Sequence, residues 1–219
     1  STPSNSSAAS DVYKRQQPET EEPYVSPIDF ASLQAQNPDI YGWLRIPGTE
    51  FDFPLVQRQG DDSFYLTHDS DGNESSAGAI FTESAYNSTT MEDPVTVAYG
   101  HQMHAGTMFG KLQETYSQEN ALEDYGEVIV YLPEKELHYQ VFAAVPYDNR
   151  HILYNYECTD SRRFNAFLNS IYEVREIGAQ FNSGVTVSTD DKVLVLSTCL
   201  AGNSQRRYLV LAVCQAEIE

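Results

Sequence analysis

The segment Lys192-Val193-Leu194-Val195-Leu196-Ser197-Thr198-Cys199 decides the fold of this chain. It is a short run of apolar, mostly β-branched residues that ends in a cysteine, and such a run is typical of a strand buried on both faces. Residues 200–206 contain glycine, asparagine and serine, which form turns. A second apolar run, 207–214, then predicts the returning strand of a hairpin.

In that hairpin Cys199 closes the first strand and Arg207 opens the second. Residues that face each other across an antiparallel pair point to the same side of the sheet, with Cβ atoms roughly 5 Å apart. The sequence therefore predicts that a thiol and a guanidinium share one end of a rigid sheet. This is a suitable place for a reactive centre.

The rest of the folded chain alternates short strands with turn-forming residues, which indicates a β-barrel or β-sandwich. The expected strands are residues 42–46, 51–56, 78–81, 95–99, 127–132, 137–147, 184–188, 193–199 and 207–214. Helical patterns interrupt them at 27–37, 107–125 and 161–177, of which the last has apolar residues at spacings of three and four. We expect a mainly β domain with a few helices.

One of the five histidines stands out by its position. His101 follows the predicted strand 95–99 through Gly100, just as Cys199 ends its own strand. A thiol and an imidazole at neighbouring strand ends would provide a nucleophile and a proton shuttle. His104 is close by but lacks the strand and the glycine, and no metal-ligand spacing is present in the sequence.

Composition excludes several classes of protein. The chain has 219 residues and a formal net charge of −19, which argues against nucleic acid or an anionic membrane surface as a partner. Its three cysteines are an odd number, so at least one is free and a disulfide framework is not expected. Cys214 lies inside an apolar run and is expected to be a buried small side chain, whereas Cys158 lies in a polar segment. No run of 18 or more apolar residues is present.

Two regions of unlike composition are expected. Residues 1–27 are rich in serine, asparagine, glutamine, glutamate and proline, which predicts a disordered linker, in part an artificial extension. Residues 28–219 carry the strands and helices and are expected to form a single catalytic domain.

Five motifs in order resemble the sortases, the cysteine transpeptidases of Gram-positive cell surfaces. Leu196-Ser197-Thr198-Cys199 with the following Arg207 is similar to their catalytic segment, and Val97-Ala98-Tyr99-Gly100-His101 to their second one. Three further stretches resemble class B sortases in particular, namely residues 37–49, 65–68, and 71–72 with 77–81. This resemblance covers roughly residues 28–216. It implies a closed barrel of about eight strands, an N-terminal helix, and a long helix between strands six and seven.

The resemblance also implies roles for individual residues. Cys199 would attack the carbonyl of a threonine in a sorting motif, His101 would protonate the departing amine, and Arg207 would bind the oxyanion or hold the substrate. Arg206 is one residue out of the family's register. Leu66, Tyr99 and Ser197 fall at positions that line the peptide groove, and the segment 151–154 is expected to form a groove wall. No cofactor is implied.

The implied partners are a surface protein with a sorting motif and an amine of the peptidoglycan, or a pilin lysine. The enzyme would act on the outer face of the cell membrane, held by an N-terminal anchor that this sequence lacks. The chain departs from some class B members in having Leu200-Ala201, and no acidic residue, directly after the cysteine. A carboxylate member of the site therefore cannot be assigned.

Other functions stay open at the level of sequence. A class B sortase that polymerises pilins would use the same residues with a lysine acceptor. A cysteine protease would use Cys199 and His101 with water as the acceptor. An acidic β-rich domain could also serve as a non-catalytic surface or pilus module. Such a module would not need three reactive side chains at strand ends.

Overall fold

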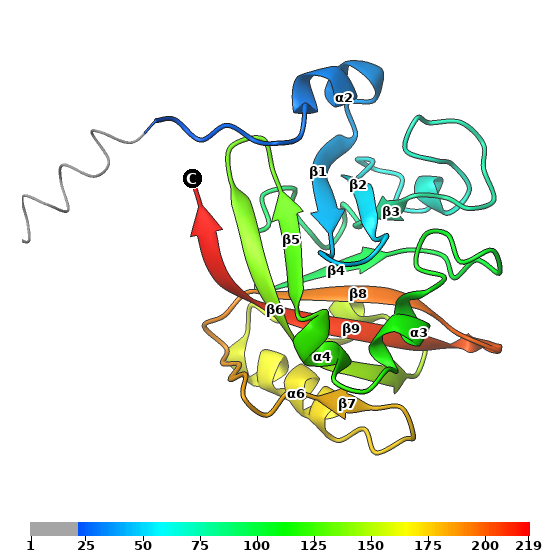
Figure 1. The fold of residues 1–219 in the computed structure, drawn as a ribbon, viewed down its shortest axis with the longest axis vertical. Helices are drawn as coiled ribbons and strands as arrows, with labels where there is room; N and C mark the ends of the chain where they lie inside the picture. Colours follow the sequence, from blue (N-terminus) through cyan, green and yellow to red (C-terminus); the bar gives the residue numbers. More distant parts are fainter. Residues whose placement is uncertain (1–21) are drawn as a thin grey trace, which may run out of the picture.

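The computed structural model describes residues 22–219, so most of the predicted linker 1–27 lies outside the described residues. Within that range, one sheet contains nine strands (Figure 1). They are β1 (Ile40–Arg45), β2 (Asp52–Val56), β3 (Ile80–Phe81), β4 (Val95–Tyr99), β5 (Glu127–Tyr131), β6 (Glu136–Tyr147), β7 (Gln180–Phe181), β8 (Val193–Leu200) and β9 (Asn203–Ile218). The helices are α2 (Phe30–Gln36), the 3₁₀ turn η1 (Phe64–Leu66), α3 (Leu112–Tyr116), α4 (Ala121–Asp124), α5 (Ile152–Asn155) and α6 (Ser161–Tyr172).

The sheet closes into a barrel. Its strand order is β5-β1-β2-β3-β4-β8-β9-β6, and a further pairing of β5 with β6 completes a ring of eight strands. The short β7 pairs with β6 outside this ring. Helix α6 lies between β6 and β7 in the chain, and α2 precedes β1. This architecture confirms the predicted closed barrel with an N-terminal helix and a long helix between strands six and seven.

The predicted central strands are buried on both faces. Residues 193–198 of β8 are all buried, and 193–196 alternate between two apolar clusters. One cluster fills the barrel and includes Leu194, Leu196, Tyr208 and Val210. The other includes Val193, Val195, Leu209 and Leu211 and packs against Phe164 and Phe167 of α6. The double burial explains why a continuous apolar run, rather than an alternating one, encodes this strand.

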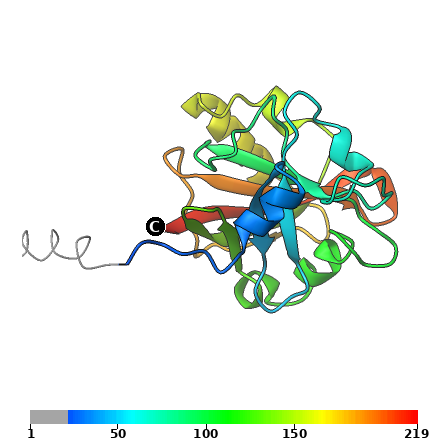
Figure 2. The ribbon, with the colours of Figure 1, turned by 90° about the horizontal axis from the view of Figure 1, so that it is seen from above.

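Helix α6 covers the outer face of the sheet, as the turned view shows (Figure 2). Its N-cap is Asp160, whose carboxylate accepts hydrogen bonds from the backbone N–H groups of Arg162 and Arg163. The helix ends at Tyr172, five residues before the predicted end at 177. The guanidinium of Arg175 donates to the carbonyl of Tyr172, and Ile177 is exposed, so the apolar face of the helix does not extend to the predicted end.

Two further predictions of secondary structure were wrong. Residues 184–188 do not form a strand, because Asn182 accepts a hydrogen bond from the Gly184 N–H at 3.0 Å and turns the chain. The pairing with β6 is made slightly earlier, by β7. The helical segment predicted at 107–125 is divided into α3 and α4, with Asn120 in the left-handed region at φ 60°.

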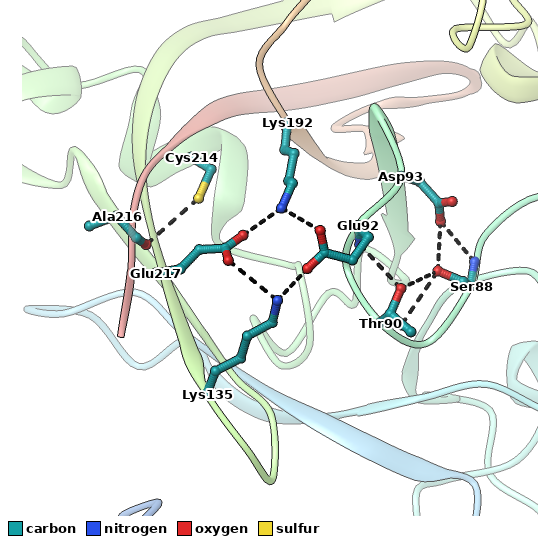
Figure 3. Close-up of polar contacts among 9 residues, drawn as sticks. All are labelled: Ser88, Thr90, Glu92, Asp93, Lys135, Lys192, Cys214, Ala216 and Glu217. Carbon is teal, nitrogen blue, oxygen red and sulfur yellow. Dashed lines mark hydrogen bonds and ion pairs between the residues drawn. The ribbon is translucent and has the colours of Figure 1, made fainter. Parts of the chain in front are cut away.

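Two lysines and two glutamates form an ion-pair ring (Figure 3). The ring lies by the start of β8, at the opposite end of that strand from Cys199. Lys192 contacts Glu92 and Glu217 at 2.6 Å each. Lys135 contacts the same two carboxylates, that of Glu217 at 3.4 Å. The ring joins the residues just before β4 and β8, the β5–β6 turn and the end of β9.

Candidate active site

The β8–β9 hairpin brings the predicted thiol and guanidinium together. Cys199 and Arg207 are partners in the antiparallel ladder, which confirms the predicted pairing. The Arg207 Nη1 atom lies 3.8 Å from the Cys199 sulfur. The same nitrogen donates to the carbonyls of Ser204 at 2.9 Å and Arg206 at 3.1 Å. The backbone of the hairpin therefore fixes the direction of the guanidinium.

Arg206 points to another partner. Its guanidinium forms an ion pair with Glu176, in which Nη2 lies 2.6 Å from the carboxylate. The hydrogen bonds between them raise the pKa of Arg206 and lower that of Glu176. Successive residues of a strand face opposite sides, so only one of the two arginines can face the thiol. In this structure it is Arg207, which agrees with the register that we expected.

Parallel pairing places His101 at the same edge. β4 and β8 run side by side in parallel, with Tyr99 opposite Ser197, and the next amide, that of Gly100, donates to the Ser197 carbonyl at 3.1 Å. The carboxyl ends of the two strands thus meet, and one carries His101 where the other carries Cys199. The structure brings all three predicted catalytic side chains to one end of the sheet.

A hydrogen bond orients the imidazole of His101. Its Nε2 atom lies 2.7 Å from the carbonyl oxygen of Leu66. A carbonyl only accepts, so Nε2 carries a proton in this arrangement and Nδ1 is the ring nitrogen left to exchange protons. Nδ1 is then the atom able to take up or deliver a proton, and Leu66, the last residue of η1, sets the orientation of the ring.

Gly100 lets Ile80 and Phe109 pack against the backbone just before His101, because no side chain fits at this position. A Cβ atom at this position would lie 2.5 Å from Cδ1 of Ile80 and 2.6 Å from Cδ2 of Phe109. Phe109 is fully buried, and its amide donates to the carbonyl of His101 at 3.0 Å. The glycine therefore lets the core close directly beneath the histidine.

The three residues predicted to line a peptide groove lie around this site. Tyr99 and Ser197 line a cavity of about 120 Å³ together with Arg207 and His151. Leu66 is exposed and provides the carbonyl that holds His101. Burial raises the pKa of Tyr99, and the charge of Glu83 adds to this effect, so its phenol stays protonated.

Sequence reasoning missed Glu83. His151 accepts from the Tyr154 N–H through Nδ1 at 3.0 Å, so its Nε2 atom donates to Glu83 at 2.8 Å. The His151 ring lies 4.6 Å from that of Tyr86 and 6.4 Å from that of Tyr99, measured between centroids. This contact fixes the predicted groove wall at α5, but its partners are 68 positions apart in sequence and no local pattern marks it.

The other two cysteines lie in less reactive surroundings. All three thiols are free. Burial raises the pKa of Cys158 to about 12, and burial also raises that of Cys214, which is half-buried rather than fully enclosed as expected. A thiol with a raised pKa forms little of the nucleophilic thiolate. Cys199 is partly exposed and differs from both in having a guanidinium beside it.

Within residues 22–219, no group of three or more His, Cys, Asp or Glu side chains is arranged to hold a metal ion. In the same part of the chain, no helix is long and apolar enough to cross a membrane.

Comparison with known proteins adds an independent line of evidence. Residues 44–215 match the profile of the sortase domain family. Sortase B of Listeria monocytogenes is 29% identical over 182 residues, which cover 78% of this chain and 67% of that protein. Sortase B of Staphylococcus aureus is 28% identical over 185 residues, which cover 84% and 73%.

Solved structures agree. A mutant form of Clostridium perfringens sortase B superposes with a TM-score of 0.73 at 25% identity, covering 85% of this chain and 86% of that one. A class B sortase of Streptococcus pyogenes involved in pilus biogenesis gives a TM-score of 0.73 at 26% identity, covering 86% and 98%.

Proposed function

Since the chain belongs to the sortase family and resembles class B sortases in sequence and structure, we propose that Cys199, His101 and Arg207 carry out its transpeptidase reaction. The observation that carries this assignment is the arrangement at the strand ends. Arg207 Nη1 lies 3.8 Å from the Cys199 sulfur, and His101 follows the parallel neighbouring strand. The catalytic domain comprises residues 28–219.

The reaction has two halves. In the first, the thiolate of Cys199 attacks the carbonyl carbon of a threonine in a sorting motif. The carbon–nitrogen bond breaks, the departing amine takes a proton from His101, and a thioester remains. The guanidinium of Arg207 donates to the oxyanion of the tetrahedral intermediate, a contribution that typically lowers a barrier by roughly 3 kcal/mol.

In the second half, an amine attacks the thioester. The carbon–sulfur bond breaks, a new amide forms, and the proton of the amine passes to His101. The acceptor we propose is a peptidoglycan amine, which fits the place of the family at Gram-positive cell surfaces. The S. pyogenes relative involved in pilus biogenesis supports one alternative, in which a pilin lysine is the acceptor. Both acceptors are primary amines, and the three catalytic side chains serve them equally.

Mass spectrometry of the products tests the proposal. The wild-type protein is incubated with a threonine–glycine sorting peptide, with and without millimolar oligoglycine or a diaminopimelate-containing stem peptide. We expect slow hydrolysis alone and a ligated product at the threonine with amine. Cys199→Ala should abolish both products while the circular dichroism spectrum stays the same. Hydrolysed acid as the only product across the panel would instead indicate a protease.

A further inference from the structure

We propose that Glu83 is a positioning residue for the sorting peptide: its carboxylate holds His151 and, with it, the wall of the proposed peptide groove at residues 151–154. The proposal rests on the proposed transpeptidase function and concerns how the first substrate binds. At this point the groove is the cavity of about 120 Å³ beside Tyr99, which we call the Tyr99 cavity. A substitution of Glu83 is therefore expected to change the affinity for the peptide rather than the chemistry at Cys199.

The Tyr99 cavity is lined by two parts of the chain. The sheet contributes Tyr99, Ser197, Arg207 and Leu209. The remaining lining comes from one segment, residues 147–152, which runs from the end of β6 to the start of α5. The shape of the cavity therefore depends on what holds this segment in place against the rest of the protein.

A hydrogen bond from His151 to Glu83 provides such a connection. Nδ1 of His151 accepts from the Tyr154 N–H at 3.0 Å, so Nε2 carries the proton that it donates to Glu83 Oε1 at 2.8 Å. The Glu83 side chain is 18% exposed and that of His151 is 34% exposed, so the contact is partly shielded from water. One imidazole of fixed tautomer thus caps α5 and also ties it to the segment after β3.

Glu83 itself stands on an anchored segment. Its carbonyl accepts from the Asn87 N–H at 2.8 Å. The buried side chain of Asn87 donates to the Val95 carbonyl at 2.9 Å and accepts from the Val97 N–H at 3.1 Å, and both of these residues belong to β4. The barrel therefore holds the segment that carries the carboxylate, and α5 is fixed from there.

The same carboxylate also acts on Tyr99. Burial raises the pKa of the Tyr99 phenol and the negative charge of Glu83 raises it further, whereas the positive charge of Arg207 lowers it. The Tyr99 ring stacks on Phe81, two residues before Glu83, with ring centroids 5.5 Å apart. Glu83 is thus close to both parts of the cavity lining, to the sheet at Tyr99 and to the α5 segment at His151.

Asp148 also lines the cavity, but its contacts are of another kind. Its carboxylate pairs with Arg150, two positions away in the same segment, at 2.6 Å. A contact within one segment does not fix that segment against the sheet. The chain has Leu200-Ala201 directly after the nucleophile, where the sequence offers no carboxylate, and Glu83 brings one to the cavity wall from the segment after β3.

Loss of this contact should weaken peptide binding and spare the chemical step. Without the hydrogen bond, α5 occupies its groove-forming position only part of the time, and the apparent affinity for the peptide falls by that fraction. The reacting groups are positioned separately. The Leu66 carbonyl holds His101, and two backbone carbonyls of the β8–β9 hairpin hold Arg207.

Single-turnover cleavage of a quenched fluorescent sorting peptide tests the role of Glu83. Glu83→Ala should raise the half-saturating peptide concentration about fivefold to tenfold, as for the loss of a hydrogen bond to a charged group, and change the maximal rate less than about twofold. Glu83→Gln keeps an oxygen that can accept from Nε2–H, so its half-saturating concentration should stay within about threefold of wild type. Glu123→Ala is the control, because Glu123 is an exposed residue of α4 outside the cavity and should change neither value.

Three outcomes of this assay would overturn the proposal. They are an unchanged half-saturating concentration in Glu83→Ala, a loss confined to its maximal rate, and a rise in Glu123→Ala or Glu83→Gln as large as in Glu83→Ala. A wild-type protein that cleaves no sorting peptide would instead refute the proposed function, so the two failures are distinct.

A double-mutant cycle separates the contact from the folding of the segment. His151→Asn keeps an acceptor for the Tyr154 N–H at the start of α5 but removes the nitrogen that reaches Glu83. We expect it to raise the half-saturating concentration as much as Glu83→Ala does, and the double variant to add nothing further. Independent, additive rises would refute the positioning role. If Glu83→Ala fails to fold, His151→Asn still decides, because an unchanged half-saturating concentration in that variant would overturn the proposal.

Discussion

The replacement Arg207→Lys tests whether the guanidinium acts by its geometry or only by its charge. In the structure one nitrogen, Nη1, faces the Cys199 sulfur at 3.8 Å and donates to two backbone carbonyls, those of Ser204 and Arg206. Lysine keeps the charge but has no planar fork, so its ammonium cannot keep the backbone contacts and also present a second, oriented donor. Removing one oriented donor to an oxyanion typically lowers kcat about 10²- to 10³-fold. We expect a loss of about 10²-fold or more in kcat/KM, with most of it in kcat.

The matched control is Arg206→Lys. Arg206 forms an exposed ion pair with Glu176, and such pairs contribute only about 0–1 kcal/mol. Its replacement should change kcat/KM less than about threefold, which is below 1 kcal/mol. The assay follows cleavage of a quenched fluorescent sorting peptide under single-turnover conditions, so that thioester formation alone is measured. Equal losses from the two variants, or a larger loss in Arg206→Lys, would refute the assignment of Arg207 as the oxyanion donor.

Three further predictions concern stability. Hydrogen bonds from Lys135, and then from Lys192, lower the pKa of Glu92. The stabilisation that Glu92 provides is therefore present above its unfolded pKa, and it is lost as the pH falls through the lower pKa of the folded state. Glu92→Gln should therefore cost about 1 kcal/mol at pH 7, limited by solvent screening, and less at pH 2.5, as urea unfolding would measure. An equal cost at both pH values would argue against the ion pair. Gly100→Ala should destabilise the protein by about 1–3 kcal/mol through its clash with Phe109 and should slow thioester formation; a wild-type melting temperature and rate would contradict this. Cys214→Ala should lower the free energy of unfolding by about 1 kcal/mol and leave peptide cleavage intact. A loss of cleavage would contradict the assignment of Cys199 as the one cysteine that the reaction needs.

The sequence predicts the centre of this fold well, because its signals are local. The strands β4, β8 and β9 are apolar runs ended by turn residues, and the observed bounds agree to within a few residues. The pairing of Cys199 with Arg207 follows from the short turn between two adjacent runs. The juxtaposition of His101 and Cys199 required the family resemblance in addition, since these residues are far apart in sequence.

Features that depend on tertiary contacts were not predictable. Val185 and Val187 alternate with polar residues as in a strand, but they pack on the outer apolar cluster without joining the ladder. The contact of His151 with Glu83 joins the residue before α5 to the segment after β3, which only the tertiary fold brings together.

The ion-pair ring and the catalytic residues lie at opposite ends of the same two strands, β4 and β8. Glu92 lies just before β4 and Lys192 just before β8, and their contact at 2.6 Å joins the starts of the two strands whose other ends lead to His101 and Cys199. A slip of one residue in a strand turns every side chain to the opposite face. Here such a slip in β8 would point the thiol into the barrel, away from Arg207. Charge pairing outside the site thus helps to keep the register on which the nucleophile depends, and the buried apolar face on each side of β8 opposes the same slip.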